Sequence, residues 1–265
     1  MKPSLLRQTC IRLIFATNMT SYEHDHIVPY EQSNLSKKEQ VAGMFDDIAG
    51  KYDFLNRFLS AGIDISWRKK ALKELLAMQP KKMLDVATGT ADVAIMASKI
   101  LQPSQIIGID ISDGMLNIGR EKIKQAGLDQ LITLENGDSE AINYPAHSFD
   151  AVTVAFGVRN FQHLEKGLSE INRVLKPGGK IVVLEFSRPK VPLVKSIYDL
   201  YMRVVTPGVG KLISKNKDAY AYLDASIRKF PEGKDFIDVL NKVGFNHSYC
   251  NKLSFGICSI YGAIK

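Results

Sequence analysis

The sequence predicts an α/β fold in which a mostly parallel sheet carries helices on both faces. Between residues 80 and 190, short apolar runs alternate with segments whose apolar residues recur every three or four positions, the spacing of one helix face. The connections between these segments are short, which predicts right-handed crossovers between neighbouring parallel strands. Of the 265 residues, 45% are hydrophobic, which is enough for one large core with an appended lid.

The first two strands and helices follow from apolar runs and their stop signals. Residues 83–87 indicate a buried strand. The helix face after it is formed by Val93, Met96, Ala97 and Ile100. Residues 106–110 indicate the second strand. A helix then begins after its predicted cap, Ser112, and ends at Gly127.

Three further strands complete the predicted parallel part of the sheet, at residues 131–135, 150–156 and 180–186. One more helix face precedes the last of them, formed by Leu164, Leu168, Ile171 and Leu175. We expect this helix to end at the segment KPGG, residues 176–179.

Two segments are helical without alternating strands, residues 38–77 and 191–231. In the second, one apolar face recurs at Val194, Ile197, Tyr198, Tyr201, Met202 and Val205. Another helix, over about 218–230, ends at Pro231. We predict that both segments are lid elements of a single domain covering 36–265. Their apolar residues are core packing by default, and the alternative is a channel for an apolar tail.

The C-terminal end of the chain predicts regular structure, whereas the N-terminal end predicts a flexible extension. A helix face at Phe236, Val239, Leu240 and Val243 stops at Gly244, and strands at 245–251 and 256–264 indicate a terminal hairpin. At the other end, residues 1–35 predict a flexible extension, with translation normally starting at Met19. The composition of the extension also allows a transit peptide.

The net charge and the cysteines leave several classes of function open. The formal net charge of +7 fits nucleic acid, an anionic membrane surface or a solvated basic face. The three cysteines, Cys10, Cys250 and Cys258, lack metal-ligand spacing and indicate a reducing compartment without a disulfide framework. No apolar run approaches the roughly 18 residues that span a bilayer. We expect a cytoplasmic protein without a metal site.

The stretch MLDVATGTADVA, residues 83–94, ends a strand in a turn of a kind that often holds a nucleotide. A P-loop needs a lysine and a hydroxyl residue after its glycines, and this order does not occur here. A dinucleotide fold needs the pattern GxGxxG, and the turn contains only Gly89. The helix begins with Asp92, which would repel a pyrophosphate. The turn residues Thr88, Gly89 and Thr90 therefore predict a site for a nucleoside without phosphates.

Asp110 closes the second predicted strand. In open α/β sheets, ligands bind beyond the carboxyl ends of the strands, where the strand order reverses. A carboxylate there accepts hydrogen bonds from both ribose hydroxyls, at roughly 1.5–3 kcal/mol each. The alternative for Asp110 is a solvated aspartate at a strand end.

The segment after the third strand predicts the contacts of the base. Asp138 can accept a hydrogen bond from the adenine amine, and the backbone N–H of Ser139 can donate to the ring. Ile111 and Met115 can flank the face of the adenine. Four acids are expected around the site: Asp85, Asp92, Asp110 and Asp138. An acidic site without a phosphate clamp fits S-adenosylmethionine, a nucleoside with a cationic sulfonium.

At these residues the chain resembles the quinone-biosynthesis C-methyltransferases, which comprise the demethylmenaquinone methyltransferases and their ubiquinone-pathway relatives. The resemblance covers about residues 38–265. The segments that carry it are MFDDIAGKYDFLNRFLSAGIDISWRK, LDVATGTADVA, GIDISDGML, GDSEAINYPAHSFDAVTVAFGVRNF and VLKPGGKIVVLEFSRP. The family implies a seven-stranded, Rossmann-like class I fold with an antiparallel terminal hairpin. It also implies cofactor contacts at Thr90, Asp110, Asp138 and Ser139.

The chain departs from the family pattern at two positions. Ala91 stands where the family commonly has glycine, and its methyl group is tolerated if the residue has a negative φ. Ala155 stands where many relatives have serine, so we expect no side-chain contact from that position.

The acceptor is predicted from what the chain lacks. The Asn/Asp-Pro-Pro-aromatic stretch of amino-methylating enzymes is replaced by FGVRN, residues 156–160, and no cysteine follows the fourth or fifth strand. An acceptor that provides its own nucleophile, such as a hydroquinol, fits better. Arg159 is the candidate that stabilises the phenolate oxygen, and Asn160 orients the second oxygen or a water. The alternative for Arg159 is a surface arginine paired with an acid.

Several other residues are candidates for the acceptor site. His163 is the rival base, although a capping or exposed role fits it better. Tyr52, Asp53 and Tyr144 are further candidates to face the acceptor.

The sequence thus predicts an S-adenosylmethionine-dependent C-methyltransferase of a prenylated quinol, with demethylmenaquinol first and the benzoquinol of the ubiquinone route second. An RNA or protein methyltransferase and a non-enzymatic adenosyl-binding module are the alternatives from other classes. Peripheral contact with the inner face of the membrane fits the charge. We expect no nucleic-acid partner, and a homodimer remains open.

Overall fold

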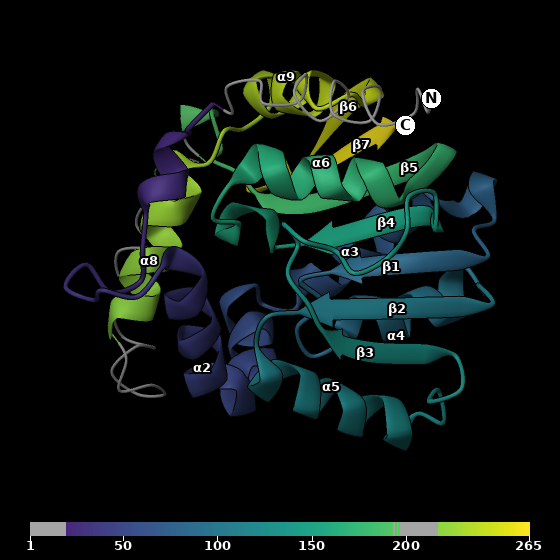
Figure 1. Ribbon diagram of the computed structural model, residues 1–265. Coiled ribbons are helices and arrows are strands. Elements are labelled where there is room, and N and C mark those ends of the chain that lie inside the picture. Colours follow the sequence, from purple (N-terminus) through teal and green to yellow (C-terminus); the bar gives the residue numbers. More distant parts are fainter. Residues whose placement is uncertain (1–19, 193, 195, 197–216) are drawn as a thin grey trace, which may run out of the picture.

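The computed structural model describes residues 20–192, 194, 196 and 217–265, and these residues form a seven-stranded sheet with helices on both faces (Figure 1). The strands are β1 (Lys82–Val86), β2 (Gln105–Asp110), β3 (Ile132–Asn136), β4 (Phe149–Ala155), β5 (Leu175–Phe186), β6 (Asn246–Leu253) and β7 (Cys258–Ile264). The α-helices are α2 (Lys37–Leu59), α3 (Ile63–Lys73), α4 (Asp92–Ile100), α5 (Asp113–Gln125), α6 (Leu164–Val174), α8 (Lys217–Lys229) and α9 (Lys234–Lys242). The 3-10 turns are η1 (Glu23–His26), η2 (Leu76–Met78), η3 (Val158–Asn160) and η4 (Ser254–Gly256).

The strand order is β3-β2-β1-β4-β5-β7-β6. The pairs from β3 to β5 are parallel, whereas β7 runs antiparallel to both β5 and β6. This arrangement confirms the predicted mostly parallel sheet with an antiparallel terminal hairpin. The order reverses between β1 and β4, so ligands are expected beyond the carboxyl ends of these two strands.

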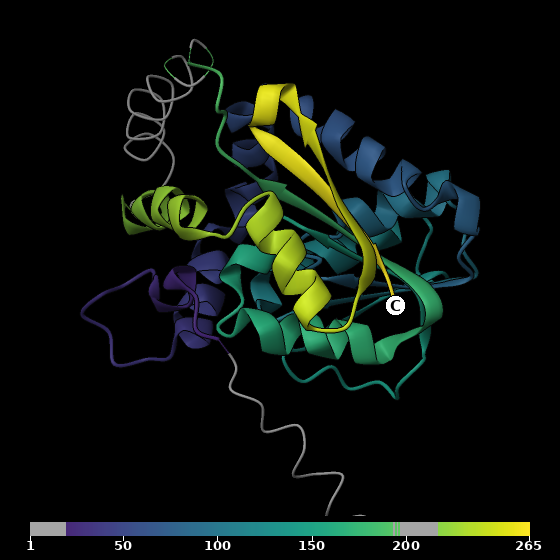
Figure 2. The same cartoon turned by 90° about the horizontal axis from the view of Figure 1, so that it is seen from above.

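Each face of the sheet has its own apolar core. On one face, α6 and α9 pack on alternate strand residues such as Leu84, Val152 and Val183. On the other face, α3, α4 and α5 pack on the intervening residues, such as Met83 and Val182. Figure 2 shows α6 and α9, in green and yellow-green, on the opposite side of the sheet from the blue α3. Burial on both faces explains why the parallel strands are continuous apolar runs.

The segment KPGG does not separate α6 from β5 as expected. The helix ends at Val174, and Leu175 already pairs with Phe149 in the sheet. The next pair is Lys180 with Ala151, so residues 176–179 form an irregularity inside the strand. Leu175 was placed on a helix face because its spacing from Ile171 suits a helix, but its side chain is buried in the sheet.

Helices α2 and α8 lie beyond the carboxyl ends of the parallel strands, on the side to which the arrows of β1, β2 and β4 point in Figure 1. Helix α2 begins at a capping box, in which Ser36 and Glu39 bond each other's backbone N–H groups. In the second predicted lid segment, α8 is observed close to its expected position. Most of the predicted apolar face, Ile197, Tyr198, Tyr201, Met202 and Val205, lies outside the described residues.

Residues 20–35 differ from the flexible extension that the sequence predicts, because several of them pack on the domain. His24 is fully buried and its ring meets Phe230 edge-on, with centroids 5.5 Å apart. The hydroxyl of Tyr22 donates to Glu165 at 2.7 Å. The ammonium of Lys37, which is itself buried, donates to the carbonyl of His24 at 2.6 Å. Residues 1–19 lie outside the described part.

Two properties of the described residues concern ligands and membranes. None of their helices is long and apolar enough to cross a bilayer. No group of three or more His, Cys, Asp or Glu residues among them is arranged to hold a metal ion.

Candidate active site

The turn after β1 brings the first predicted site residues to the carboxyl edge of the sheet. The backbone takes positive φ angles at Ala87 (54°), Gly89 (55°) and Ala91 (64°). The condition of a negative φ at Ala91 is therefore not met, and its side chain costs roughly 1–2 kcal/mol of backbone strain there. The glycine that the related family commonly carries at this position would avoid that strain. The N–H of Thr88 donates to the carbonyl of Ile109 at 3.0 Å, which ties the turn to β2.

Asp85, near the end of β1, is 2% exposed. The hydroxyls of Thr88 and Thr153 each donate to one of its carboxylate oxygens, both at 2.6 Å. Burial raises the pKa of Asp85 to about 6, although these two hydrogen bonds act in the opposite direction. At pH 7 the carboxylate is therefore mostly ionised, but its pKa lies only about one unit below that pH.

Asp110, at the end of β2, is fixed by backbone N–H groups. One carboxylate oxygen accepts from Gly89 at 2.8 Å and the other from Ser112 at 2.9 Å. Burial raises the pKa of Asp110, and the backbone bonds oppose that rise. The backbone N–H of Ile111 also bonds this carboxylate, so at least one of its four lone pairs is left for a hydroxyl. The hydroxyl of Ser112 accepts from Met115 at 3.2 Å, which confirms the predicted helix cap.

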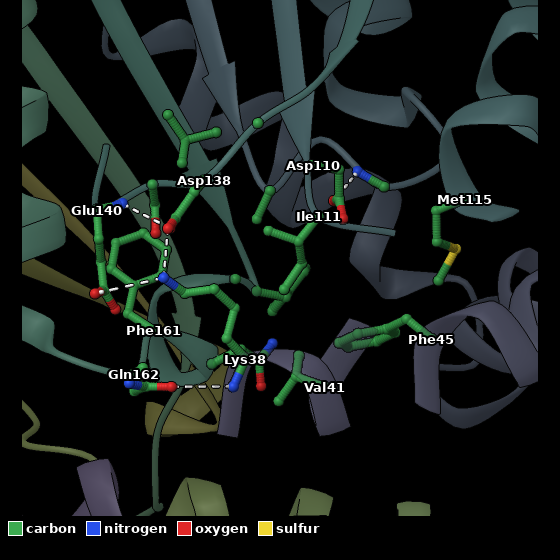
Figure 3. Close-up of a pocket in the computed structure, with 18 of the residues that line it drawn as sticks. Lys38, Val41, Phe45, Asp110, Ile111, Met115, Asp138, Glu140, Phe161 and Gln162 are labelled. Carbon is green, nitrogen blue, oxygen red and sulfur yellow. Dashed lines mark hydrogen bonds and ion pairs between the residues drawn. The ribbon is translucent and has the colours of Figure 1, made fainter. Parts of the chain in front are cut away.

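A cleft of about 650 Å³ opens beyond the carboxyl ends of the strands, between the sheet and α2. Many of the predicted site residues line it: Gly89, Asp110, Ile111, Met115, Asp138, Ser139 and Asn160. Figure 3 shows Asp110 and Asp138 on the sheet side of this cleft, with Val41 and Phe45 reaching it from α2. The structure therefore brings the proposed ribose and adenine residues into one space, and its walls combine acids with apolar side chains.

Lys38, which the sequence reasoning missed, joins α2 to the predicted adenine site. Its ammonium forms an ion pair with Asp138 and lies 3.6 Å from Glu140, between the two acids in Figure 3. The other oxygen of Asp138 accepts from the N–H of Glu140 at 2.9 Å. Because Lys38 and Asp138 are 100 positions apart, no local pattern links them.

A second cavity of about 320 Å³ adjoins the cleft at the β1 turn and shares Tyr52, Ala87, Gly89 and Ala155 with it. The remaining predicted cofactor-binding residues line it: Asp85, Thr88 and Thr90. Asp92 and Arg68 also line it, and Arg68 is a second residue that the sequence reasoning missed.

Asp92 is surrounded by cations. Lys122 lies 2.5 Å and Arg57 2.7 Å from its carboxylate. Burial by itself raises the pKa of Asp92, but the hydrogen bond and charge of Lys122 and the nearby arginines outweigh it and lower the pKa. Asp53 is occupied in the same way, since it accepts from Thr90 at 2.6 Å and from Lys122 at 2.7 Å. Asp53 thus faces this charged cluster, between the turn after β1 and α5.

The two predicted acceptor residues have different surroundings. Asn160 lines the cleft, and its side-chain oxygen accepts from the hydroxyl of Tyr222 on α8 at 3.0 Å. Arg159 is 6% exposed and does not line the cleft. Its guanidinium lies 2.7 Å from Glu185, which is fully buried, and also donates to the carbonyl of Phe156. Arg159 is thus half of a buried ion pair, rather than a surface arginine.

The remaining candidates occupy separate places. Tyr52 lines both cavities. Tyr144 donates to Glu135 at 2.8 Å, and it is not among the residues that line either cavity. His163 is exposed and its side chain makes no capping bond, so of the two roles suggested for it only exposure is observed.

Comparison with known proteins places this geometry in a family. Residues 33–265 match the ubiE/COQ5 methyltransferase family. A demethylmenaquinone methyltransferase from Bacteroides fragilis is 47% identical over 245 residues, which cover 92% of this chain and 100% of that protein. A ubiquinone/menaquinone biosynthesis C-methyltransferase from Geobacter sulfurreducens is 45% identical over 230 residues, which cover 86% of this chain and 90% of that protein.

Solved structures show the same fold at low identity. An S-adenosylmethionine-dependent methyltransferase from Thermotoga maritima superimposes with a TM-score of 0.58 at 18% identity, covering 84% of this chain and 99% of that chain. A methyltransferase structure from Methanococcus maripaludis gives a TM-score of 0.59 at 19% identity, covering 83% of this chain and 93% of that chain.

Proposed function

The chain belongs to the ubiE/COQ5 methyltransferase family, and we propose that it methylates a ring carbon of a prenylated quinol, with demethylmenaquinol as the first choice. Membership makes it a methyltransferase, and its methyl donor is S-adenosylmethionine. The observation that carries the choice of acceptor is the 47% identity to a demethylmenaquinone methyltransferase that the chain covers from end to end. The benzoquinol of the ubiquinone route is the second candidate, because the Geobacter relative is named for both pathways.

The residues around the two cavities fit this donor. We assign the ribose hydroxyls to Asp110, which lines the cleft at the end of β2. Ile111 and Met115 would flank the adenine, with Asp138 accepting from its amine and Ser139 donating to its ring. The amino-acid end would reach the second cavity, where it meets these residues: Asp85, Thr88, Gly89 and Thr90. A crystal structure with S-adenosylhomocysteine would test each contact directly, and a base lying away from Asp138 would overturn the assignment.

When bound, the donor supplies an electrophilic methyl group on a cationic sulfur. The phenolate form of the quinol makes the adjacent ring carbon nucleophilic, the methyl moves from sulfur to that carbon, and the sulfur keeps the bonding pair. The ring then loses its C–H proton and becomes aromatic again. Because a cation and an anion neutralise each other in this step, exclusion of water by α2 would accelerate it.

We assign the direct contact with the acceptor to Asn160 and an electrostatic contribution to Arg159. Asn160 lines the cleft and is oriented by Tyr222. Arg159 pairs with Glu185 and is not among the residues that line either cavity, so its positive charge would act at a distance and lower the pKa of the phenol. Glu185 offsets part of that charge. Burial raises the pKa of Glu185, and the neighbouring Arg159 opposes that rise.

We further propose that the protein works at the cytoplasmic face of the membrane, where a prenylated quinol resides. The outer face of α2 carries Phe54 and Phe58, which are 57% and 51% exposed and stack with centroids 5.9 Å apart. The inner face of the same helix reaches the cleft with Phe45. Together with the net charge of +7, this face suits an anionic lipid surface.

The test of the proposed function is product analysis with a labelled methyl donor. Demethylmenaquinol, the benzoquinol precursor and RNA are supplied in parallel, and the label should appear on the ring carbon of demethylmenaquinol. Asn160→Ala should slow this turnover by about 10- to 100-fold, the range for a hydrogen bond to a charged oxygen, with S-adenosylhomocysteine still bound. Label in RNA alone, or in neither quinol, would refute the proposal.

A further inference from the structure

The second cavity contains a basic residue that the family pattern and the sequence reasoning left unassigned. Arg68 comes from α3, is 4% exposed and lines this cavity together with Asp85. Asp85 lies on β1, and the charge of Arg68 stabilises its ionised form. One small cavity thus presents a carboxylate and a guanidinium, and this combination matches a zwitterion.

The guanidinium of Arg68 is fixed by neighbours, but one of its hydrogen-bond donors is unpaired within the described part of the chain. Its Nη1 pairs with Asp64, one helical turn earlier, and lies 3.4 Å from Asp92. The central carbon of the Arg68 guanidinium lies 5.5 Å from the centroid of the Phe156 ring. Among the described residues, the buried Nε of Arg68 has no hydrogen-bond partner. A buried donor without a partner costs about 1–3 kcal/mol, and an acceptor group of a ligand in the adjoining cavity would remove this cost.

The position of the cavity defines that ligand. The cavity joins the main cleft through four shared residues: Tyr52, Ala87, Gly89 and Ala155. An adenosyl group held at Asp110 would therefore extend its 5′ substituent past Gly89 into the second cavity. In the methyl donor, this substituent ends in an α-amino acid, which carries one ammonium and one carboxylate.

We propose that Arg68 binds the α-carboxylate of the methyl donor through the Nε edge of its guanidinium. Arginine suits this role because its planar fork matches a carboxylate with two parallel hydrogen bonds. Asp64 and the Phe156 ring fix the orientation of the fork before the ligand arrives. The inference rests on the proposed function, since it takes the donor to lie in the two cavities, and it makes α3 part of the donor site.

The experiment compares two ligands on the full chain by titration calorimetry. S-adenosylhomocysteine has the carboxylate, and its decarboxylated analogue keeps the adenosyl group, the sulfur and the amine. The parent protein should bind S-adenosylhomocysteine about 10- to 100-fold more tightly than the analogue, the range for a charge-assisted hydrogen bond. In Arg68→Gln, this ratio should fall to within about threefold, because an amide cannot form the charged pair.

Arg57→Gln is the matched control. Arg57 pairs with the same two acids, Asp64 and Asp92, but is not among the residues that line the cavity. If loss of charge balance in this cluster weakened binding in general, both variants would weaken both ligands, and their ratio would stay as in the parent. A direct contact changes the ratio only in Arg68→Gln. Arg68→Lys, which keeps the charge without the fork, should give an intermediate ratio.

Two results would overturn the inference. Equal affinity of the parent for the two ligands would show that the carboxylate is not recognised, whatever the folding of the variants. An unchanged ratio in Arg68→Gln would show that another group binds it. Neither result touches the choice of acceptor, because no quinol is present. Failure of the parent to bind S-adenosylhomocysteine at all would instead refute the proposed placement of the donor.

Discussion

At the scale of single residues, the aspartates around the site differ in the groups that bond their carboxylates. In the described part of the chain, Asp85 accepts from two threonine hydroxyls at the second cavity, whereas Asp110 accepts from backbone N–H groups at the cleft. Asp92, which lines the second cavity, is paired with three cations. Residue type and position at a strand end were enough to select these acids. Their roles depend on neighbours that the sequence does not place.

Asp85 predicts a measurable dependence of stability on pH. Its pKa is about 6 in the folded protein and 3.8 in the reference state, so the folded protein binds the proton more tightly. The contribution of Asp85 to stability is therefore fully present below about pH 4 and lost as the pH rises through 6. Relative to the parent, Asp85→Asn should gain up to about 3 kcal/mol of unfolding free energy between pH 4 and 7.5.

Urea unfolding at several pH values checks this expectation, with Asp150→Asn as the comparison. Burial raises the pKa of Asp150, but Lys176 and two backbone N–H groups outweigh it, so the net shift is downward. Its contribution to stability is therefore lost only as the pH falls below about 4, so the difference between Asp150→Asn and the parent should stay nearly constant between pH 4 and 7.5. A constant difference between Asp85→Asn and the parent across this range would contradict the pKa shift.

At the scale of elements, the sheet was predictable because its signals are local. Apolar runs, the cap at Ser112 and the turn at Gly89 lie within a few residues of the structure they specify. Strand β5 was harder, because the KPGG segment has turn residues yet sits inside the strand as an irregularity. The position of α2 across the cleft was not predictable in detail. It is fixed by contacts such as Asp46 with Ser112 and Gly114, at 2.6 and 2.8 Å, which span more than 60 positions.

Lys38 gives α2 a direct influence on donor binding. If the adenine amine binds Asp138 as proposed, it would compete with the ammonium of Lys38, which pairs with the same carboxylate. Both side chains are about 30% exposed, at 30% and 29%, so the pair is worth only up to about 1 kcal/mol. Lys38→Met should therefore bind S-adenosylhomocysteine up to about fivefold more tightly in calorimetry.

Lys166→Met is the control for this prediction, because Lys166 also approaches Glu140, at 3.7 Å, but is not among the residues that line the cleft. Its affinity should equal that of the parent. Weaker binding by Lys38→Met would mean that Lys38 holds the donor in place instead of competing with it.

At the scale of the whole molecule, the structure departs most from the prediction where distant parts of the chain pack together. Tyr22 and Glu165 are 143 positions apart, and their hydrogen bond joins a segment predicted to be flexible to α6. No periodicity or turn signal reports such a pair, because each partner alone suits an exposed position. The same holds for Lys38 and Arg68 in the candidate site.

The overall shape also sets which surface meets a membrane, and this proposal predicts vesicle binding. Phe54 and Phe58 lie on α2, beyond the carboxyl edge of the sheet, where the cleft opens. A fully buried phenylalanine contributes about 1.5–3 kcal/mol, and partial insertion contributes less. The double variant Phe54→Ser/Phe58→Ser should therefore lower partitioning onto phosphatidylglycerol vesicles by roughly 10-fold or more in a flotation assay.

Leu76→Ser is the matched control, because Leu76 is 45% exposed and lies in η2, which precedes β1 at the opposite edge of the sheet. It should bind vesicles as the parent does. Binding of the parent should also weaken with added salt and on uncharged phosphatidylcholine, because the net charge of +7 contributes to attraction. If the double variant floated with the vesicles as well as Leu76→Ser, the aromatic face of α2 would not be the contact, and the acceptor would have to reach the cleft by another side.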